Sequence, residues 1–163
     1  MVRSSKHRSG LGAEHPYCDS TQNVMLILFF VVWGLDSFIL NYSTVLVDFV
    51  PFFFRLFPAI LTFSLGAYLA MKAHTVVFND QPKLLGAGVY SWVRHPMYLG
   101  TLLVCFGFLL AISSILALMI WIAFFLIYDK MATYEENDLR RILGEEYGAY
   151  QKRVPKWLLR LVQ

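Results

Sequence analysis

Charged residues are scarce in this sequence. Asp, Glu, Lys and Arg together make up only 15% of its 163 residues, while 58% are hydrophobic and the mean hydropathy is +0.55. Soluble domains carry about 25% charged and about 45–50% apolar residues, and a chain of this length cannot hide so large an apolar excess in one core. The composition excludes an ordinary soluble globular domain and indicates a protein that lies in a membrane.

Several common kinds of functional site are also missing. The two cysteines, Cys18 and Cys105, stand far apart and share no metal-ligand spacing, so we expect neither a disulfide staple nor a metal site. No Gly-x-Gly-x-x-Gly unit is present, which excludes a Rossmann nucleotide-binding domain. The net charge is +3, but the basic residues are spread along the chain and do not gather beside aromatic residues, so we expect no nucleic-acid partner.

The apolar residues are arranged in long runs. The segment 24–71 carries few formal charges, and Pro51 divides it into two pieces of roughly membrane-spanning length. We therefore predict membrane helices at about residues 24–47 and 52–72. Asp36 falls near the middle of the first helix, where a charge is costly. Its carboxylate therefore faces a bundle interior, is protonated, or marks a shifted helix boundary.

A second apolar run, Met97–Tyr128, contains no charged residue. As one helix it would be about 48 Å long, whereas the hydrocarbon layer of a bilayer is about 30 Å thick. The Ser113-Ser114 pair near its centre is the natural place for a turn. We predict a hairpin of two helices, at about residues 97–112 and 115–130.

Four spans put both termini on the same side of the membrane as the loop 73–96. Every Lys and Arg except Arg55 then lies on that side, which agrees with the positive-inside rule. The predicted fold class is therefore all-α: a polytopic membrane protein of about four transmembrane helices with a helical hairpin and a cytoplasmic C-terminal helix. Both termini are predicted to be cytoplasmic. We expect residues 1–23 to form a polar flexible tail, residues 24–163 a single domain, and the basic residues of 152–163 to lie on anionic lipid.

The segment before the hairpin is richer in functional groups than a membrane loop requires. Pro96 suits the first turn of a helix, because its missing N–H would be unpaired there. Arg94 and His95 then lie at the N-terminus of that helix, where free amides and the helix dipole favour an anionic group such as a carboxylate. The alternative is that the segment anchors the chain at the membrane surface, with Arg94 on lipid headgroups and aromatic residues such as Tyr90 and Tyr98 in an interfacial belt.

The segment after the hairpin carries two adjacent glutamates. On a helical wheel Glu136 points along the apolar stripe, and Glu135 lies at the edge of that stripe. A carboxylate on a packed face needs a partner. The alternative is that Glu136 pairs with Arg140 one turn later, in a surface bridge worth about 0.3–0.5 kcal/mol that has no chemical role. A helix end at Gly144 would interrupt the wheel beyond that point.

Together the two segments resemble a known enzyme family. Arg94-His95-Pro96-x-Tyr98, preceded by Gly88-Val89-Tyr90, stands before the uncharged hairpin. After the hairpin comes Glu135-Glu136-x-x-Leu139-x-x-x-Leu143-Gly144-x-x-Tyr147-x-x-Tyr150-x-x-x-Val154-Pro155. In this order the two motifs resemble the isoprenylcysteine carboxyl methyltransferase family, whose relatives include the phospholipid N-methyltransferases. The resemblance covers about residues 83–157, and it departs from the family at Leu143, where Phe is usual.

The resemblance implies S-adenosylmethionine-dependent methyl transfer to a lipophilic acceptor at the cytoplasmic membrane face. It places the cofactor, whose product is S-adenosylhomocysteine, between residues 83–100 and 128–157. Arg94 is suited to the cofactor's carboxylate, Glu135 or Glu136 to its ammonium or ribose, and aromatic faces to its sulfonium. The implied catalytic residues are Arg94 and Glu136, no metal is expected, and the implied cofactor-binding residues are Gly88, Val89, Tyr90, Arg94, His95, Pro96, Tyr98, Glu135 and Glu136.

The motifs leave the acceptor and the methylated atom open. A carboxylate acceptor is already ionised and needs no base, whereas an amine needs one, for which His95 or a glutamate is available. Three alternatives stay open: an N- or S-methyltransferase on the same scaffold, a sterol-reductase-like enzyme that uses a nicotinamide cofactor, and a non-enzymatic membrane protein. The oligomeric state is open as well, and we expect substitution of Glu145 to have little effect.

Overall fold

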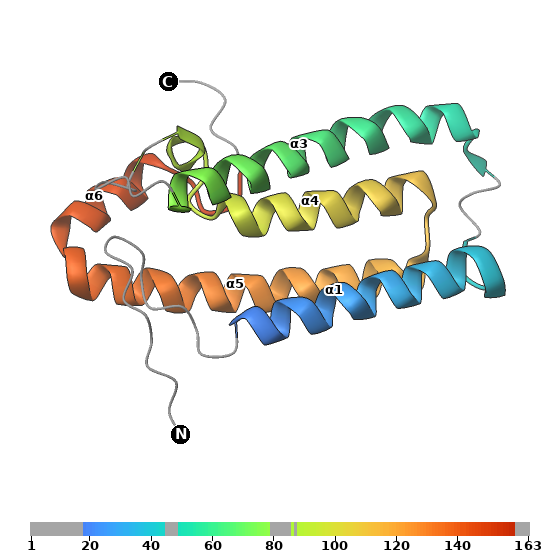
Figure 1. Ribbon diagram of the computed structural model, residues 1–163, viewed down its shortest axis with the longest axis horizontal. Coiled ribbons are helices and arrows are strands. Elements are labelled where there is room, and N and C mark those ends of the chain that lie inside the picture. The colour runs from blue at the N-terminus through green and yellow to red at the C-terminus, as the bar shows by residue number, and fades with distance from the viewer. Residues whose placement is uncertain (1–17, 45–48, 79–85, 87, 159–163) are drawn as a thin grey trace. The chain divides into compact units, whose positions relative to one another are not determined.

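A computed structural model describes residues 18–44, 49–78, 86 and 88–158 of the chain, and Figure 1 follows them from blue to red. The described residues contain helices and no strand, which confirms the predicted all-α class. A π-helical turn directly follows the first α-helix, α1, and a 3₁₀ turn lies between the helices α3 and α4. The elements are α1 (Cys18–Leu35), the π turn (Asp36–Leu40), α3 (Phe52–Phe78), the 3₁₀ turn (Gly88–Ser91), α4 (Pro96–Ala111), α5 (Ile115–Leu143) and α6 (Glu145–Arg153).

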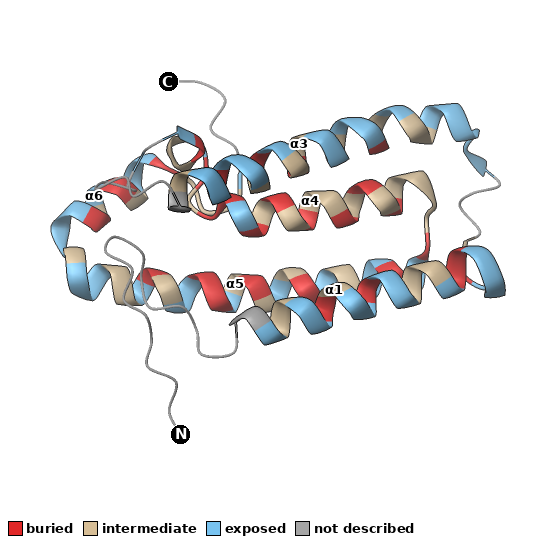
Figure 2. Cartoon of the chain, in the orientation of Figure 1, coloured by how far each residue is buried: buried red, intermediate tan, exposed pale blue. Residues whose placement is uncertain are grey.

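Three of the helical stretches are long and apolar enough to cross a membrane: Ser20–Leu40, Phe52–Val76 and Ile115–Leu143. The helix α4 is also apolar but has 16 residues, so it is shorter than these three. Figure 2 shows exposed residues along much of α1 and α3, and many of them are large and apolar, such as Phe53 at 82% exposure and Phe54 at 75%. So much exposed apolar surface fits a bilayer and not water, in agreement with the predicted polytopic membrane protein.

The chain divides into two compact units. Unit 1 comprises Met1–Cys18, Leu69–Leu99 and Tyr128–Gln163, and it contains both motif segments. Unit 2 comprises Asp19–Tyr68 and Gly100–Ile127.

The first helix differs from its predicted bounds at both ends. Residues 18–23 are helical and not part of a flexible tail, while residues 1–17 of that predicted tail lie outside the described residues. An apolar run marks only the part of a helix that lies in hydrocarbon, and extending a formed helix by a turn costs little. At the other end helical structure stops at Leu40 instead of residue 47, because Asn41 adopts a left-handed conformation with a φ of 48°.

Asp36 explains why the helix of unit 2 stops there. Its carboxylate accepts hydrogen bonds from the backbone amides of Tyr42 and Ser43, and from the hydroxyls of Ser43 and Ser114. The side chain is 1% exposed. Of the outcomes predicted for Asp36, the structure therefore shows burial in the interior and a shifted helix boundary, since the carboxylate bonds the amides of the second and third residues after the helix.

The predicted hairpin is confirmed in unit 2. The helix α4 ends at Ala111 and α5 begins at Ile115, so the break falls at the serine pair. The hydroxyl of Ser114 accepts a hydrogen bond from the amide of Ala117 at 3.1 Å, which caps α5. Arg55 donates from Nη1 to the carbonyl of Ala111 at 2.8 Å and so satisfies the other side of the turn.

The remaining helices begin where the sequence predicts and end later. The helix α3 starts at Phe52, as predicted, and continues to Phe78 instead of residue 72. The helix α5 continues past residue 130 to Leu143. The segment that carries Glu135 and Glu136 is therefore a continuation of the last predicted membrane helix.

Gly66 allows α3 and α4 to approach closely in unit 2. A Cβ at this position would lie 2.7 Å from the carbonyl oxygen of Gly100 and 2.7 Å from the amide nitrogen of Val104. Both atoms belong to the backbone and cannot rotate away. Close approach at small residues is a usual means of packing helices in a bilayer.

We expect Gly66→Ala to destabilise unit 2 by about 1–3 kcal/mol, because the added methyl group must push the two helices apart. The measurement is thermal unfolding of detergent-purified protein followed by circular dichroism. Gly34→Ala is the matched control, since a Cβ at Gly34 in α1 meets no atom within 4 Å. Equal melting temperatures for the two variants would contradict the tight helix contact.

Candidate functional site

The first motif segment lies at the start of α4 in unit 1. Pro96 begins this helix, as predicted, and is buried. The amide of Arg94 donates to the carbonyl of Pro155 at 3.0 Å, so the C-terminal segment anchors the backbone just before the helix. The side chains of Arg94 and His95 are 13% and 8% exposed. Both are therefore held in a fixed, largely desolvated place.

The second motif segment folds back on itself. The helix α5 ends at Leu143, and Gly144 has a φ of 53°, a left-handed conformation that suits glycine. The helix α6 then begins at Glu145. Three buried residues of the returning chain pack against Leu139 and Leu143 of α5: Tyr147, Tyr150 and Val154. This reversal brings the polar face of α6 beside the glutamates of α5.

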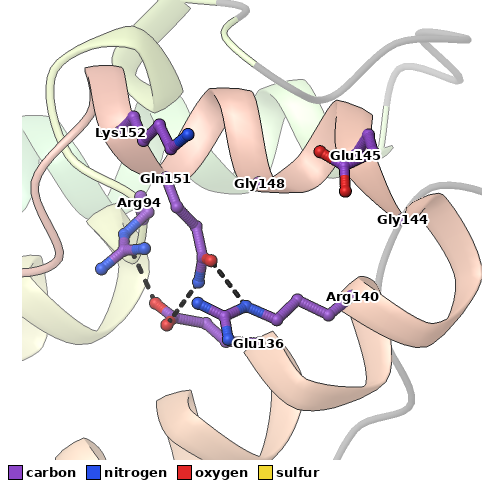
Figure 3. Close-up of a pocket in the computed structure, with 8 residues that line it drawn as sticks. All are labelled: Arg94, Glu136, Arg140, Gly144, Glu145, Gly148, Gln151 and Lys152. Carbon is purple, nitrogen blue, oxygen red and sulfur yellow. Dashed lines mark hydrogen bonds and ion pairs between the residues drawn. The ribbon is translucent and has the colours of Figure 1, made fainter.

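Glu136 is the centre of a buried polar network. Its Oε1 lies 2.9 Å from Nε2 of His95. The same oxygen lies 3.4 Å from Nε of Arg94, which Figure 3 draws beside it. Its Oε2 accepts a hydrogen bond from the side-chain amide of Gln151 at 2.9 Å. Arg140 in turn donates from Nε to the Gln151 carbonyl oxygen at 2.7 Å. Both carboxylate oxygens are thus engaged, as burial of a charged group requires.

This network decides between the two predictions for Glu136. The side chain is buried, as the helical wheel predicts, at 8% residue exposure. Among the described residues no ion pair joins Glu136 to Arg140, whose guanidinium bonds Gln151 instead. The surface-bridge alternative is therefore wrong, because the reversal of the chain at Gly144 supplies a different partner for each of the two side chains.

Glu135 occupies the other side of the His95 ring. Its Oε2 lies 3.6 Å from His95 Nδ1, and the hydroxyl of Tyr98 donates to its Oε1. The His95 ring stacks on Tyr98 at 5.8 Å between centroids, and Tyr98 stacks on Tyr128 at 4.5 Å. The imidazole therefore has a carboxylate near each ring nitrogen and an aromatic ring against its face, which fixes its orientation.

The remaining predicted site residues, Gly88, Val89, Tyr90 and Pro96, shape the backbone around this network. Val89 is 4% exposed and packs in the interior of unit 1. Gly88 has a φ of 54° at the start of the 3₁₀ turn. The carbonyl of Tyr90 accepts a hydrogen bond from the Tyr150 hydroxyl at 2.7 Å, which ties the turn to α6. The structure thus gives these three residues, and Pro96, contacts that shape the backbone.

Three tyrosines near the site keep their protons at neutral pH. Burial raises the pKa of the Tyr90 phenol, and the negative charge of Glu135 adds to the shift. Burial also raises the pKa of Tyr147 and of Tyr150. In the region around α6 these phenols therefore contribute no charge, and that of Tyr150 donates a hydrogen bond to the Tyr90 carbonyl.

A pocket of about 630 Å³ opens beside the Glu136 network. Small-molecule sites in proteins are typically about 300–1,000 Å³. The wall combines three cationic side chains, two carboxylates, an amide and two glycines. The lining residues are Arg94, Glu136, Arg140, Gly144, Glu145, Gly148, Gln151 and Lys152.

Of these lining residues only Arg94 and Glu136 were predicted from the sequence. Substitution of Glu145, which the structure places on the pocket wall, was expected to have little effect. The signal was present in the spacing, because Glu145, Gly148 and Lys152 recur on one face of a helix. A wheel continued from α5 cannot reveal that face, since the helix axis changes direction at Gly144.

The chain after α6 packs against α5 in unit 1. The indole Nε1 of Trp157 donates to Asp129 at 2.7 Å, and the ammonium of Lys156 donates to the same carboxylate at 2.6 Å and to the Thr133 hydroxyl at 2.8 Å. The ammonium of Lys156 is therefore paired with Asp129 of α5, and contact of the basic residues of 152–163 with anionic lipid stays a prediction. Residues 159–163 lie outside the described residues.

The sequence of this chain matches the model of one known protein family. The sequence model described as phospholipid methyltransferase matches residues 53–146, which include α4, α5 and both glutamates of the network. The chain belongs to this family. No solved structure matches it at a significant level.

Several curated relatives carry a more specific name. This chain is 36% identical over 81 residues to a probable protein-S-isoprenylcysteine O-methyltransferase of Oryza sativa subsp. indica. The matched region covers 47% of this chain and 41% of the relative. The identity is 33% over 81 residues to protein-S-isoprenylcysteine O-methyltransferase of Xenopus laevis and 34% over 85 residues to that of Homo sapiens. Each covers 49% of this chain and 28% of the relative. The match therefore spans less than half the length of these relatives.

Proposed function

We propose that this protein transfers a methyl group from S-adenosylmethionine to a lipophilic acceptor at the membrane. The observation that carries the proposal is the Glu136 network, in which Arg94 and His95 meet a carboxylate from a helix 41 residues further along the chain beside a pocket of ligand size. Membership of a methyltransferase family supports methyl transfer over nicotinamide-dependent reduction or a purely structural role.

The pocket residues fit this cofactor. S-adenosylmethionine carries a carboxylate, an ammonium, ribose hydroxyls and a flat adenine ring. The guanidinium of Arg94 suits the carboxylate. Glu136 suits the ammonium, because a carboxylate has about four acceptor sites and its hydrogen bonds with His95 and Gln151 use only two of them. At Gly148 a Cβ would meet no atom within 4 Å, so the glycine leaves the wall open for the rest of the ligand.

The protein's own groups then have defined tasks. When bound, the cofactor supplies an electrophilic methyl group. Arg94 and Glu136 hold the amino-acid portion and so orient the sulfonium toward the acceptor, which is where positioning lowers the barrier. The aromatic side chains around His95 exclude water from that face. His95, oriented by two carboxylates, is the group available to take a proton if the acceptor is an amine.

We propose a carboxylate of an isoprenylated cysteine as the acceptor, because the matched relatives carry that activity in their names. Such an acceptor is ionised at neutral pH and needs only orientation and desolvation. Both termini and the pocket are proposed to lie on the cytoplasmic side, since every Lys and Arg except Arg55 falls on that side of a four-span topology.

Calorimetric titration of S-adenosylhomocysteine into detergent-purified protein tests the cofactor site. We expect saturable binding, and we expect Arg94→Ala to weaken it by about 10- to 100-fold, because an ion pair with the ligand carboxylate is lost. Arg141→Ala is the control: it removes an exposed arginine near the end of α5 that does not line the pocket. Absence of binding to a helical, monodisperse preparation would contradict the proposed function.

Transfer of a labelled methyl group tests the acceptor. We expect product with a farnesylated cysteine that has a free carboxylate and none with its methyl ester. Phosphatidylethanolamine vesicles are the second acceptor in the same assay. Product from the phospholipid alone would overturn the carboxylate acceptor while leaving the cofactor site intact.

A further inference from the structure

The amino-acid end of the cofactor and its ribose end require separate partners. Its carboxylate and ammonium stand on one carbon, so both bind near Arg94 and Glu136 in the proposed site. The ribose is joined to that carbon through a short chain that contains the sulfur. Whatever binds the ribose hydroxyls must therefore lie further along the pocket wall.

Two residues of α6 that line the pocket, Gln151 and Glu145, are separated along the helix axis by a suitable distance. Gln151 contacts Glu136 and so marks the amino-acid end. Glu145 is six residues earlier on the same continuous helix, which corresponds to about 9 Å along the axis. Figure 3 draws Glu145 at the far side of the lining from Arg94. Between them Gly148 has no side chain, and a Cβ there would meet open space.

Glu145 is also chemically available. It lines the pocket and is exposed, and its carboxylate makes no hydrogen bond or ion pair with any described residue. Lys152 lies seven residues later on the same helix, about 10 Å away along the axis, too far for the two charges to pair directly. A carboxylate with free acceptor sites binds a vicinal diol well, because each oxygen accepts from one hydroxyl.

We propose that Glu145 binds the ribose hydroxyls of the cofactor, and that Gly148 leaves room for the chain between the ribose and the amino-acid end. This inference rests on the proposed function. It assigns the two pocket carboxylates different tasks: Glu136 organises Arg94 and His95 at one end, while Glu145 selects a ribose with free hydroxyls at the other. It also reverses the expectation from sequence that Glu145 has little effect.

A thermodynamic cycle, in which the affinities of two proteins for two ligands are compared, tests whether Glu145 binds the ribose hydroxyls. The proteins are the full chain and its Glu145→Ala variant, and the ligands are S-adenosylhomocysteine and its 2′,3′-dideoxy analogue. We expect the variant to bind S-adenosylhomocysteine about 10- to 100-fold more weakly, since hydrogen bonds to a charged group are lost. We expect the wild-type chain to lose a similar factor with the dideoxy ligand, and the variant to bind the two ligands equally.

The matched control is Glu146→Ala. It removes the same charge from the first turn of α6 but does not line the pocket, so binding is expected to stay within about twofold. The assignment is overturned if Glu145→Ala leaves S-adenosylhomocysteine affinity unchanged, or if it weakens both ligands by the same factor. Failure of the wild-type chain to bind S-adenosylhomocysteine at all would instead remove the proposed function itself.

Discussion

Glu136→Ala is expected to reduce S-adenosylhomocysteine binding by more than about 100-fold and to destabilise unit 1 by about 3–5 kcal/mol. The carboxylate is the shared partner of Arg94, His95 and Gln151, and its residue is 8% exposed. Removing it leaves a buried guanidinium without its counter-charge, which costs more than a surface pair would contribute. Calorimetry measures the affinity, and chemical unfolding followed by circular dichroism measures the stability.

Glu136→Gln separates the two effects. This variant keeps the size of the side chain and an acceptor oxygen for His95 but removes the charge that faces Arg94. We expect most of the stability to return and most of the ligand affinity to stay lost, because orientation of Arg94 requires the full charge. Unchanged affinity in both variants would show that the network is structural and that the ligand binds elsewhere.

Asp36→Ala is expected to destabilise unit 2 by about 3 kcal/mol or more. The carboxylate accepts from two backbone amides and from the hydroxyls of Ser43 and Ser114, and it is 1% exposed. Each buried donor left without a partner costs about 1–3 kcal/mol. Since Ser114 also caps α5, loss of Asp36 is expected to loosen the hairpin turn. Thermal unfolding in detergent measures the effect.

Ser37→Ala is the control for this prediction. Ser37 is the adjacent residue in the π turn, and its hydroxyl is buried without a hydrogen-bond partner among the described residues. Its removal should leave the melting temperature unchanged or raise it slightly, because no bond is lost. Similar losses in Asp36→Ala and Ser37→Ala would mean that packing of the π turn, and not the hydrogen bonds of Asp36, holds the turn.

The hydropathy of the chain predicts most of the helices. The starts at residues 52 and 115 and the break at the Ser113-Ser114 pair agree with the structure. The predicted end of the first helix was wrong, because hydropathy does not register a carboxylate that folds back on the amides of Tyr42 and Ser43. Helix length beyond the hydrocarbon was also underestimated in α3 and α5, since extending a helix into polar surroundings leaves no apolar signal.

The two motifs likewise predict part of the site. Periodicity alone placed Glu136 on a packed face, and Pro96 placed Arg94 and His95 at a helix start. These inferences hold because they depend on neighbours within one or two turns, where spacing fixes direction. The first segment and the two glutamates of the second also belong to the region that matches the family model, which ends at residue 146.

Only the tertiary structure decides what surrounds Glu136. Its partners come from residues far away in the chain, and no local pattern shows that Gln151 takes one oxygen while Arg94 and His95 share the other. The reversal at Gly144 brings Glu145 to the same pocket. The sequence by itself therefore determined the membrane class, most of the helices and the burial of Glu136, whose signals are local. The pairing of those side chains and the pocket arise from a change in chain direction, which periodicity along one helix axis cannot encode.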